Sequence, residues 1–212
     1  MSQLQKAIQR IRRREGPSLG FGPVAREKPR ALLAAAMAST ADEVAGAIGA
    51  GVDVVFVAAE GSDGYLALAA DPDSGEAVVG AYLPRLDTDD ASSLREAACD
   101  FVASPLTATA AAAVDREQMG HVISVPSDVS DTTLRSLGPL GLAALFVELD
   151  TPTLTLGSQL NLVRLASFSS TPLFVTGEPG IGVDELRVLR DSGVAGLRSR
   201  RNKCRCRITA SS

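Results

Sequence analysis

Three stretches of the sequence carry one pattern: GAIGAGVDVVFVAAE at 46–60, LRSLGPLGLAALFVELD at 134–150 and LRVLRDSGVAGLRSR at 186–200. Each begins as an amphipathic segment, passes through a glycine and continues as a short apolar run that ends in a small or polar residue. A glycine at a helix end takes the left-handed cap, and an apolar run after it is typical of a buried strand. The pattern therefore predicts successive helix–strand units of a parallel α/β protein.

Eight segments have the composition of buried strands, and their starts lie roughly 20–30 residues apart, which is the length of one strand–helix unit. They are Arg30–Met37, Val52–Ala59, Glu76–Leu83, Asp100–Ala103, His121–Pro126, Leu142–Leu149, Pro172–Thr176 and Val194–Leu197. Eight such units predict a compact (βα)8 TIM-type barrel, and the 212 residues lie near the lower size limit of that fold, about 200 residues.

The alternative is an open doubly wound sheet. Its dinucleotide-binding form needs a glycine-rich first turn, and the first turn here, MASTADEV, has no glycine. Good N-cap residues precede three of the expected helices. These caps are Ser39 or Thr40, Asp87 or Thr88, and Ser130 or Asp131.

Residues 1–29 are predicted to form a basic N-terminal helix and a Gly/Pro-rich linker. Leu4, Ala7, Ile8 and Ile11 make an apolar stripe opposite a basic face, as in an amphipathic helix. We expect this helix to close the bottom of the barrel or to pack on its side. The alternative is that it binds an anionic membrane or a partner.

The barrel is then expected over 30–198 and a basic, disordered tail over 199–212. The last residues, RSRRNKCRCRITASS, have no apolar period, so we expect the barrel to be incomplete at its C-terminal helix. Two explanations stay open for this tail, a genuine basic extension and out-of-frame sequence.

Charge is distributed unevenly along the chain. Residues 1–30 hold eight basic and two acidic side chains, 198–212 hold six basic ones, and 31–197 hold seven arginines and 23 carboxylates. An acidic body argues against nucleic-acid binding by the barrel.

Several features bear on location. No apolar run reaches the roughly 20 residues that span a bilayer, and no apolar segment of a secretory signal follows the basic start. The three cysteines provide no disulfide framework. We therefore expect a cytoplasmic protein without a transmembrane segment.

The candidate chemistry lies at the carboxyl ends of the strands, where TIM barrels keep their working residues. Glu148 and Asp150 end the sixth strand on the same side and could supply oxygen ligands to Mg²⁺. Arg85 could pair with an anionic group of a substrate. We predict Glu148, Asp150 and Arg85 as catalytic residues, and Glu148 and Asp150 as metal ligands. The alternative is that acidic residues at strand ends only cap helices and keep loops in solvent.

Absent residue types exclude other chemistry. No lysine lies between Lys28 and Lys203, so a Schiff-base mechanism is excluded from the barrel interior. His121 is the one histidine and is expected at the opposite end of the barrel, in a structural role. A His-rich zinc site and Ser-His-Asp catalysis are therefore not expected.

The stretch TGEPGIG at 176–182 stands before a predicted helix, VDELRVLRDSG. It resembles the strand-seven turn of the phosphate-binding TIM barrels, the ribulose-phosphate-binding and flavin-dependent groups. The resemblance implies that Gly177, Gly180 and Gly182 hold a phosphate-bearing ligand through backbone N–H groups. Those families carry a Gly-Ser or Gly-Thr pair at the end of strand eight, where this chain has Arg198-Ser199-Arg200.

Two classes of function stay open. The first is a barrel without efficient catalysis that works as a binding or assembly subunit and forms a homo-oligomer, which the scarcity of catalytic groups favours. The second is an enzyme of lyase or isomerase type, acting on a small phosphorylated or carboxylated metabolite with Mg²⁺. Both classes accommodate a small anionic ligand.

Overall fold

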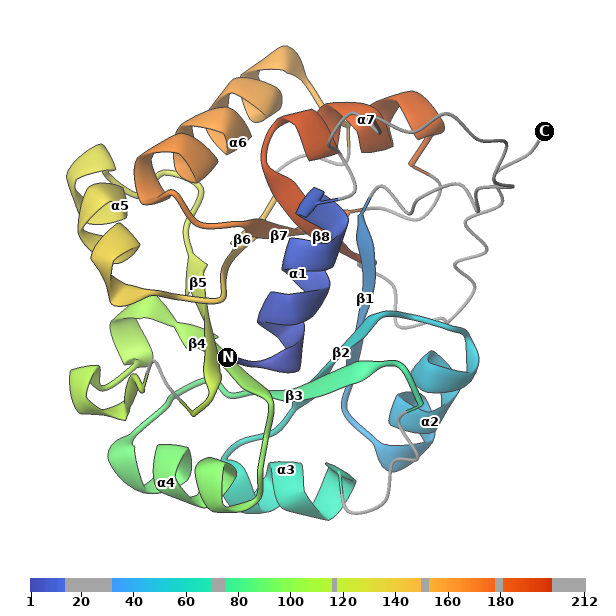
Figure 1. Cartoon of the computed structure of the whole chain (residues 1–212), viewed down its shortest axis with the longest axis vertical. Coiled ribbons are helices and arrows are strands. Elements are labelled where there is room, and N and C mark those ends of the chain that lie inside the picture. The colour runs from blue at the N-terminus through green and yellow to red at the C-terminus, as the bar shows by residue number, and fades with distance from the viewer. Residues whose placement is uncertain (14–31, 70–74, 116–117, 150–152, 178–180, 200–212) are drawn as a thin grey trace.

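The computed structural model describes residues 1–13, 32–69, 75–115, 118–149, 153–177 and 181–199. Within these ranges eight parallel strands close into one barrel in the order β1 to β8 (Figure 1). The predicted TIM-type barrel is therefore confirmed, with each strand at its predicted place. The strands are β1 Leu33–Ala38, β2 Val54–Ala58, β3 Val78–Tyr82, β4 Phe101–Pro105, β5 Gly120–Val125, β6 Ala144–Glu148, β7 Leu173–Gly177 and β8 Val194–Ser199.

Helices surround the barrel, and one more lies across its end (Figure 1). Thr40, Asp87 and Ser130 each accept a hydrogen bond from a backbone N–H of the helix that follows, so the predicted caps are confirmed. The helices are α1 Gln3–Arg13, α2 Ala41–Gly49, α3 Ser62–Ala69, α4 Thr88–Glu96, α5 Asp131–Leu137, α6 Leu156–Ser169 and α7 Val183–Asp191.

The glycine of each repeated stretch has the backbone conformation that the pattern predicts. Gly51, Gly141 and Gly193 have φ angles of 74°, 65° and 90°. Residues with a Cβ are strained in this left-handed region, so glycine allows the chain to turn from the helix directly into the strand. A glycine in the left-handed conformation thus precedes β2, β6 and β8.

Four phenylalanines fill the centre of the barrel. Phe56 lies 5.1 Å from Phe101, 5.8 Å from Phe174 and 6.0 Å from Phe146 between ring centroids. The first two pairs meet edge to face, a favourable arrangement for aromatic quadrupoles. Gly196 faces this layer, and a Cβ there would overlap the ring of Phe174. The interior is therefore a packed core and not a channel.

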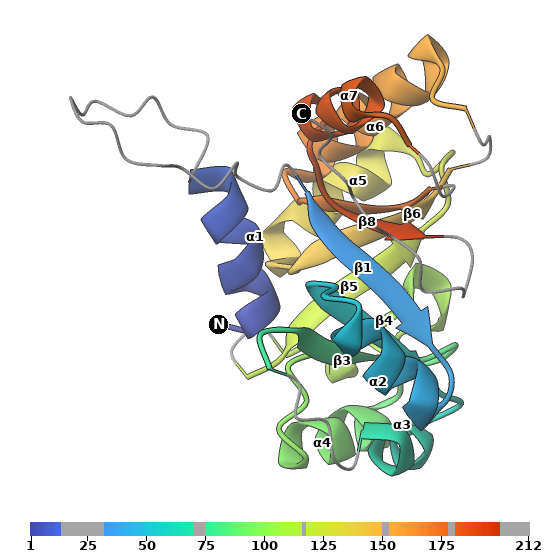
Figure 2. The ribbon, with the colours of Figure 1, turned by 90° about the vertical axis from the view of Figure 1, so that its right-hand side faces the viewer.

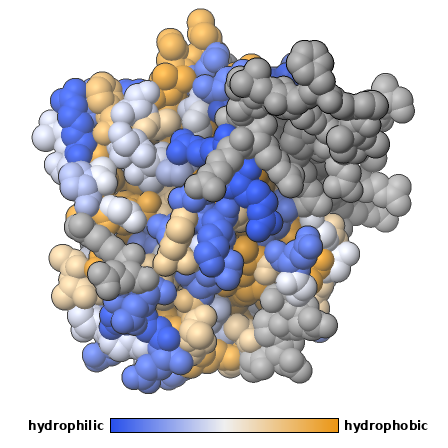
Figure 3. Space-filling model, viewed as in Figure 1, coloured by the Kyte–Doolittle hydropathy of each residue, from blue (hydrophilic) through white to orange (hydrophobic). Residues whose placement is uncertain are grey.

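Helix α1 closes the amino-terminal end of the barrel (Figures 1 and 2). Leu4 and Ile8 are buried in the same cluster as the interior phenylalanines. The Asp100 carboxylate accepts from the backbone N–H groups of Gln3 and Leu4, the latter at 2.9 Å. Figure 3 shows hydrophilic side chains gathered over α1 on the outer side. The prediction of a helix closing the bottom is confirmed, and its apolar stripe is occupied by the barrel.

The remaining domain boundaries rest on residues outside the described ranges. Residues 14–29 of the predicted linker and 200–212 of the predicted tail are among these, while β8 extends to Ser199. The division into helix and linker, barrel, and tail stays a prediction. Across the described ranges, no helix combines the length and the apolar character needed to cross a membrane.

Candidate functional site

Three polar side chains form one row across the last three strands of the barrel. Glu148 on β6 is in register with Thr176 on β7, and Thr176 is in register with Arg198 on β8. Side chains in register on adjacent parallel strands point to the same face. Phe146 and Phe174 stand two residues earlier on their strands and lie in the interior cluster. The row therefore faces inward at the carboxyl-terminal mouth, the end at which TIM barrels carry their active sites.

The guanidinium of Arg198 is the centre of this row. Its Nη2 donates to Glu148 Oε1 at 3.2 Å and to Thr176 Oγ1 at 3.1 Å, and its Nη1 contacts Met37 Sδ at 3.2 Å. Its carbon Cζ stands 4.7 Å from the centroid of the Phe146 ring. Contacts from β1, β6 and β7 thus fix an arginine that β8 supplies, and only 12% of its side chain is exposed.

This environment strengthens the attraction of Arg198 for anions. The aromatic layer below it excludes water, and a charge–charge interaction grows as the local dielectric constant falls. A guanidinium also presents N–H groups in a planar fork that matches a carboxylate or a phosphate. Glu148 is 66% exposed, so a ligand anion would compete with a largely solvated partner.

The predicted catalytic residue Arg85 lies elsewhere on the rim. Its side chain is 74% exposed, and its Nη2 stands 3.3 Å from Asp87 Oδ2. Asp87 is the N-cap of α4, so this ion pair lies over the start of that helix. In the described part of the chain no contact joins Arg85 to Glu148 or Arg198. A role for Arg85 in ligand binding stays a prediction.

Two other acidic residues of the rim lie in the described part of the chain. Glu60 and Asp128 are exposed to solvent. The described ranges hold no cluster of three His, Cys, Asp or Glu side chains suited to a metal ion. Asp150, the second predicted ligand, lies outside the described residues. Magnesium binding by Glu148 and Asp150 therefore stays a prediction.

Two of the three predicted phosphate-binding glycines have other roles in the described structure. A Cβ on Gly177 would stand 2.7 Å from both Ile181 Cδ1 and Leu197 Cδ1, so glycine here permits close packing of side chains. The N–H of Gly182 donates to Glu185 Oε2 at 3.0 Å, which places a carboxylate at the start of α7. Gly180 lies outside the described residues. Phosphate binding at this loop stays a prediction.

His121 has the surroundings of a structural residue. It is 3% exposed, at the start of β5, and its Nε2 accepts from the Asp115 backbone N–H at 3.0 Å. Burial lowers the pKa of His121, because desolvation disfavours the charged imidazolium. Arg95 and Asp115 form an ion pair nearby, at 3.0 Å.

The sequence places Arg198 at the end of the eighth strand but does not identify it as the centre of the site. Its contact with Met37 joins residues 161 positions apart, and no local pattern encodes such a pairing. The available signal was its place at the end of β8, where the phosphate-binding barrels carry a glycine pair instead.

No protein-family model matches this sequence, and no curated protein sequence matches it. Solved structures with the same fold do match this chain. KGPDC from Streptococcus mutans aligns with a TM-score of 0.62 and 17% identity, over 80% of this chain and 88% of that one. Tryptophan synthase from Mycobacterium tuberculosis aligns at 0.61 and 13%, over 93% and 88%.

A third similar structure is the HpcH/HpaI aldolase from Desulfitobacterium hafniense, with a TM-score of 0.58 and 11% identity over 79% of this chain and 85% of that one. At such low identities the likeness shows the shared barrel fold. The fold resemblance inferred from the sequence is therefore confirmed, and function has to be argued from the site.

Proposed function

We propose that this protein binds a small carboxylated or phosphorylated metabolite at the carboxyl-terminal mouth of the barrel, with Arg198 as the anchoring cation. One observation carries the proposal: Arg198 is held by three strands above an aromatic floor, with 12% of its side chain exposed. Fixing a guanidinium in advance lowers the entropy lost when a ligand binds.

The few polar side chains at the mouth favour ligand binding over efficient catalysis. The row supplies one guanidinium, one carboxylate and one hydroxyl, and the barrel interior has no lysine. This arrangement suits recognition of an anion better than a multistep reaction.

The second candidate is an enzyme of lyase or isomerase type. The position of Glu148 favours it, because a carboxylate beside the anion-binding arginine could accept a proton from the carbon next to a substrate carbonyl. The solved barrels that this chain resembles include an aldolase and a synthase. In this reading Glu148 is the general base and Arg198 the anchor.

Titration calorimetry with propionate, pyruvate and inorganic phosphate as probes tests the proposal. We expect the native protein to bind at least one of them and Arg198→Gln to lose at least tenfold in affinity. Arg187→Gln is the matched control, because Arg187 is 64% exposed on α7. Equal affinities in the native protein and the Arg198 variant would overturn the proposal.

Deuterium exchange separates the two candidates. An enzyme would exchange the methyl protons of bound pyruvate faster than buffer does, and Glu148→Gln would abolish the exchange. Binding of pyruvate without enhanced exchange would favour the non-catalytic candidate.

Self-association is a separate part of the proposal, carried by α6. Leu156, Leu160 and Val163 are 70%, 62% and 39% exposed and recur at helical spacing on one face. Apolar side chains gathered in this way often mark an interface. We expect Leu160→Glu to lower the oligomeric state in sedimentation velocity, and an unchanged state would count against an interface on α6.

A further inference from the structure

The described part of the connection between β4 and β5 forms short 3-10 turns in place of an α-helix. The second turn, η2 Ala111–Ala113, lies against α4 and leads to Val114 and Asp115. Within 111–115 only Ala113 is buried. A segment that buries so little apolar surface opens more easily than the helices and strands around it.

This segment is attached at both ends. Before it, the Ala110 N–H donates to the Leu86 carbonyl at 2.8 Å, a bond between backbone groups that do not titrate. At its end, the Asp115 N–H donates to His121 Nε2 at 3.0 Å, and the Asp115 carboxylate pairs with Arg95 of α4 at 3.0 Å. The second attachment therefore includes a ring that can gain a proton near neutral pH.

The bond from Asp115 requires the neutral form of His121. A ring nitrogen accepts a hydrogen bond through its lone pair, and in the imidazolium both nitrogens carry protons and only donate. Because Nε2 is the acceptor here, the neutral ring carries its proton on Nδ1, and an added proton goes to Nε2. That proton would face the Asp115 N–H, one donor against another. Protonation of the ring and closure of the segment therefore oppose each other.

The surroundings of His121 also disfavour the charged ring. The residue is 3% exposed, and Nδ1 has no hydrogen-bond partner among the described residues. Burial lowers the pKa of His121; of the described charged groups that act on it, Arg95 lowers the pKa further and Asp115 opposes both effects. Opening the segment would bring water to the ring and remove the desolvation penalty on the imidazolium.

We infer that His121 is a pH-sensitive latch on the segment 111–115: the neutral ring holds the segment closed, and protonation releases it. The ring has the higher pKa in the open state, so a falling pH favours opening. The pairing of β4 with β5 uses backbone groups, so the barrel stays closed when the segment opens. The inference is independent of the ligand site proposed at the mouth.

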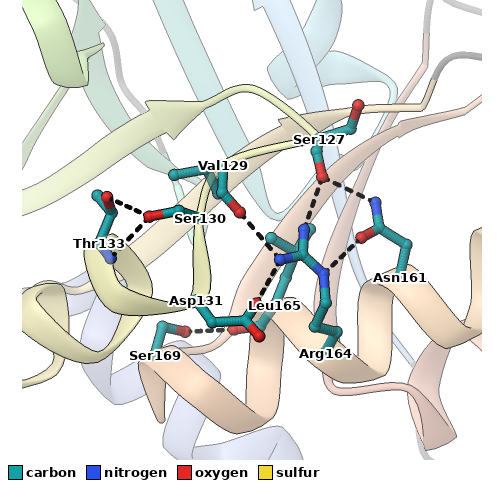
Figure 4. Close-up of polar contacts among 9 residues, drawn as sticks. All are labelled: Ser127, Val129, Ser130, Asp131, Thr133, Asn161, Arg164, Leu165 and Ser169. Carbon is teal, nitrogen blue, oxygen red and sulfur yellow. Dashed lines mark hydrogen bonds and ion pairs between the residues drawn. The ribbon is translucent and has the colours of Figure 1, made fainter.

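The connection after β5 provides an internal comparison (Figure 4). Arg164 of α6 donates to the Ser127 carbonyl at 3.0 Å and to the Val129 carbonyl at 2.9 Å. A guanidinium keeps its charge at every pH that a folded protein tolerates, and backbone carbonyls do not titrate. These two bonds should therefore persist at a pH that opens the segment 111–115.

Amide hydrogen exchange, followed by NMR in the native protein, tests the latch. Protection factors remove the intrinsic effect of pH on exchange, and His121 is the one histidine of the chain. For one proton and an open-state pKa of about 6.5, we expect the protection factors of Ala113 and Asp115 to be about tenfold lower at about pH 5.5 than at about pH 7.5. Those of Val122 in β5 and of Val129 should stay within twofold.

Two variants sharpen the test. His121→Gln keeps a side-chain acceptor that binds no proton in this pH range, so the protection of Ala113 and Asp115 should not change with pH. His121→Phe keeps a buried ring without an acceptor and should lower their protection at both pH values.

Three results in the native protein would overturn the latch. A parallel loss of protection at Val122 and Val129 would mean that the whole barrel unfolds. A loss at Asp115 alone would mean that one hydrogen bond is exchanged while the segment stays in place. Unchanged protection at both Ala113 and Asp115 would mean that the closed segment tolerates the protonated ring.

Discussion

The two ends of the barrel differ in the side chains that line them: apolar at the amino-terminal end, and charged or polar at the carboxyl-terminal end. At the amino-terminal end, α1 inserts Leu4 and Ile8, which are 0% and 3% exposed, and its first N–H groups are bound by Asp100. At the carboxyl-terminal end, Arg198, Glu148 and Thr176 meet above the phenylalanine layer. One end buries apolar surface, which stabilises the fold, and the other keeps charged groups within reach of solvent.

Because of this difference, we expect residues at one end of the barrel to determine its stability and residues at the other end to determine ligand binding. Changes at the end closed by α1 should alter the free energy of unfolding and leave the affinity for anions intact. Changes at the mouth should have the opposite effect. The division agrees with the general behaviour of TIM barrels, and it can be tested in four ways.

The largest loss of stability is expected from Leu4→Ala. Removing a fully buried leucine side chain costs about 2–5 kcal/mol, through lost burial and the cavity left behind. Urea unfolding measures this change. Val183→Ala, at a 57% exposed site on α7, is the control and should cost less than about 0.5 kcal/mol. Similar losses in both variants would mean that α1 contributes little.

Asp100→Ala should have the next largest effect. It removes the acceptor for two N–H groups at the start of α1 and a negative charge that favours a helix N-terminus, together worth about 1–2 kcal/mol. Asp184→Ala, with a side chain 94% exposed on α7, provides the comparison. If the two variants unfold at the same urea concentration, Asp100 does not secure α1.

A smaller effect is expected from the titration of His121. Burial lowers its pKa in the folded protein, so the unfolded chain, with a pKa of about 6.5, binds the proton more readily. Stability should therefore fall as the pH drops below about 6.5 towards the folded pKa. Urea unfolding at a series of pH values should show a shallower fall for His121→Gln. A profile identical to that of the native protein would assign the acid sensitivity to other groups.

The smallest effect on stability is expected from Arg198→Met. The change keeps a long side chain over Phe146 and leaves Glu148 largely solvated, so unfolding should shift by less than about 1 kcal/mol. Propionate and phosphate binding should nevertheless be lost in calorimetry. A large loss of stability would show that Arg198 serves the fold first, and the contrast between the two ends would fail.

The fold was predictable because its signals are local. Gly51, Gly141 and Gly193 end their helices in the left-handed conformation, and Thr40, Asp87 and Ser130 begin theirs. Each signal acts within a few residues of the chain. Their repetition was enough to predict the strand–helix order and the barrel.

The site was less predictable because it depends on pairing between distant strands. Arg85 and Arg198 both follow strand segments expected from the sequence, and the structure pairs Arg85 with Asp87, only two residues away. Arg198 meets Glu148 across 50 residues, in a register that follows an irregularity at Leu173 and Phe174. Gly177 was also hard to interpret from the sequence. A glycine is needed there because Ile181 and Leu197 pack closely against it, and this explains the residue as well as a bound ligand would.

The position of α1 also has a consequence for the order of events on the ribosome. This helix is synthesised before the strands of the barrel, since proteins are made from the amino terminus, yet its apolar face lies in a cluster that includes Phe174 and Ala195. Those partners belong to β7 and β8, which follow the other six described strands of the barrel. The apolar stripe of α1 must therefore stay uncovered until β8 has been synthesised and completes its binding surface.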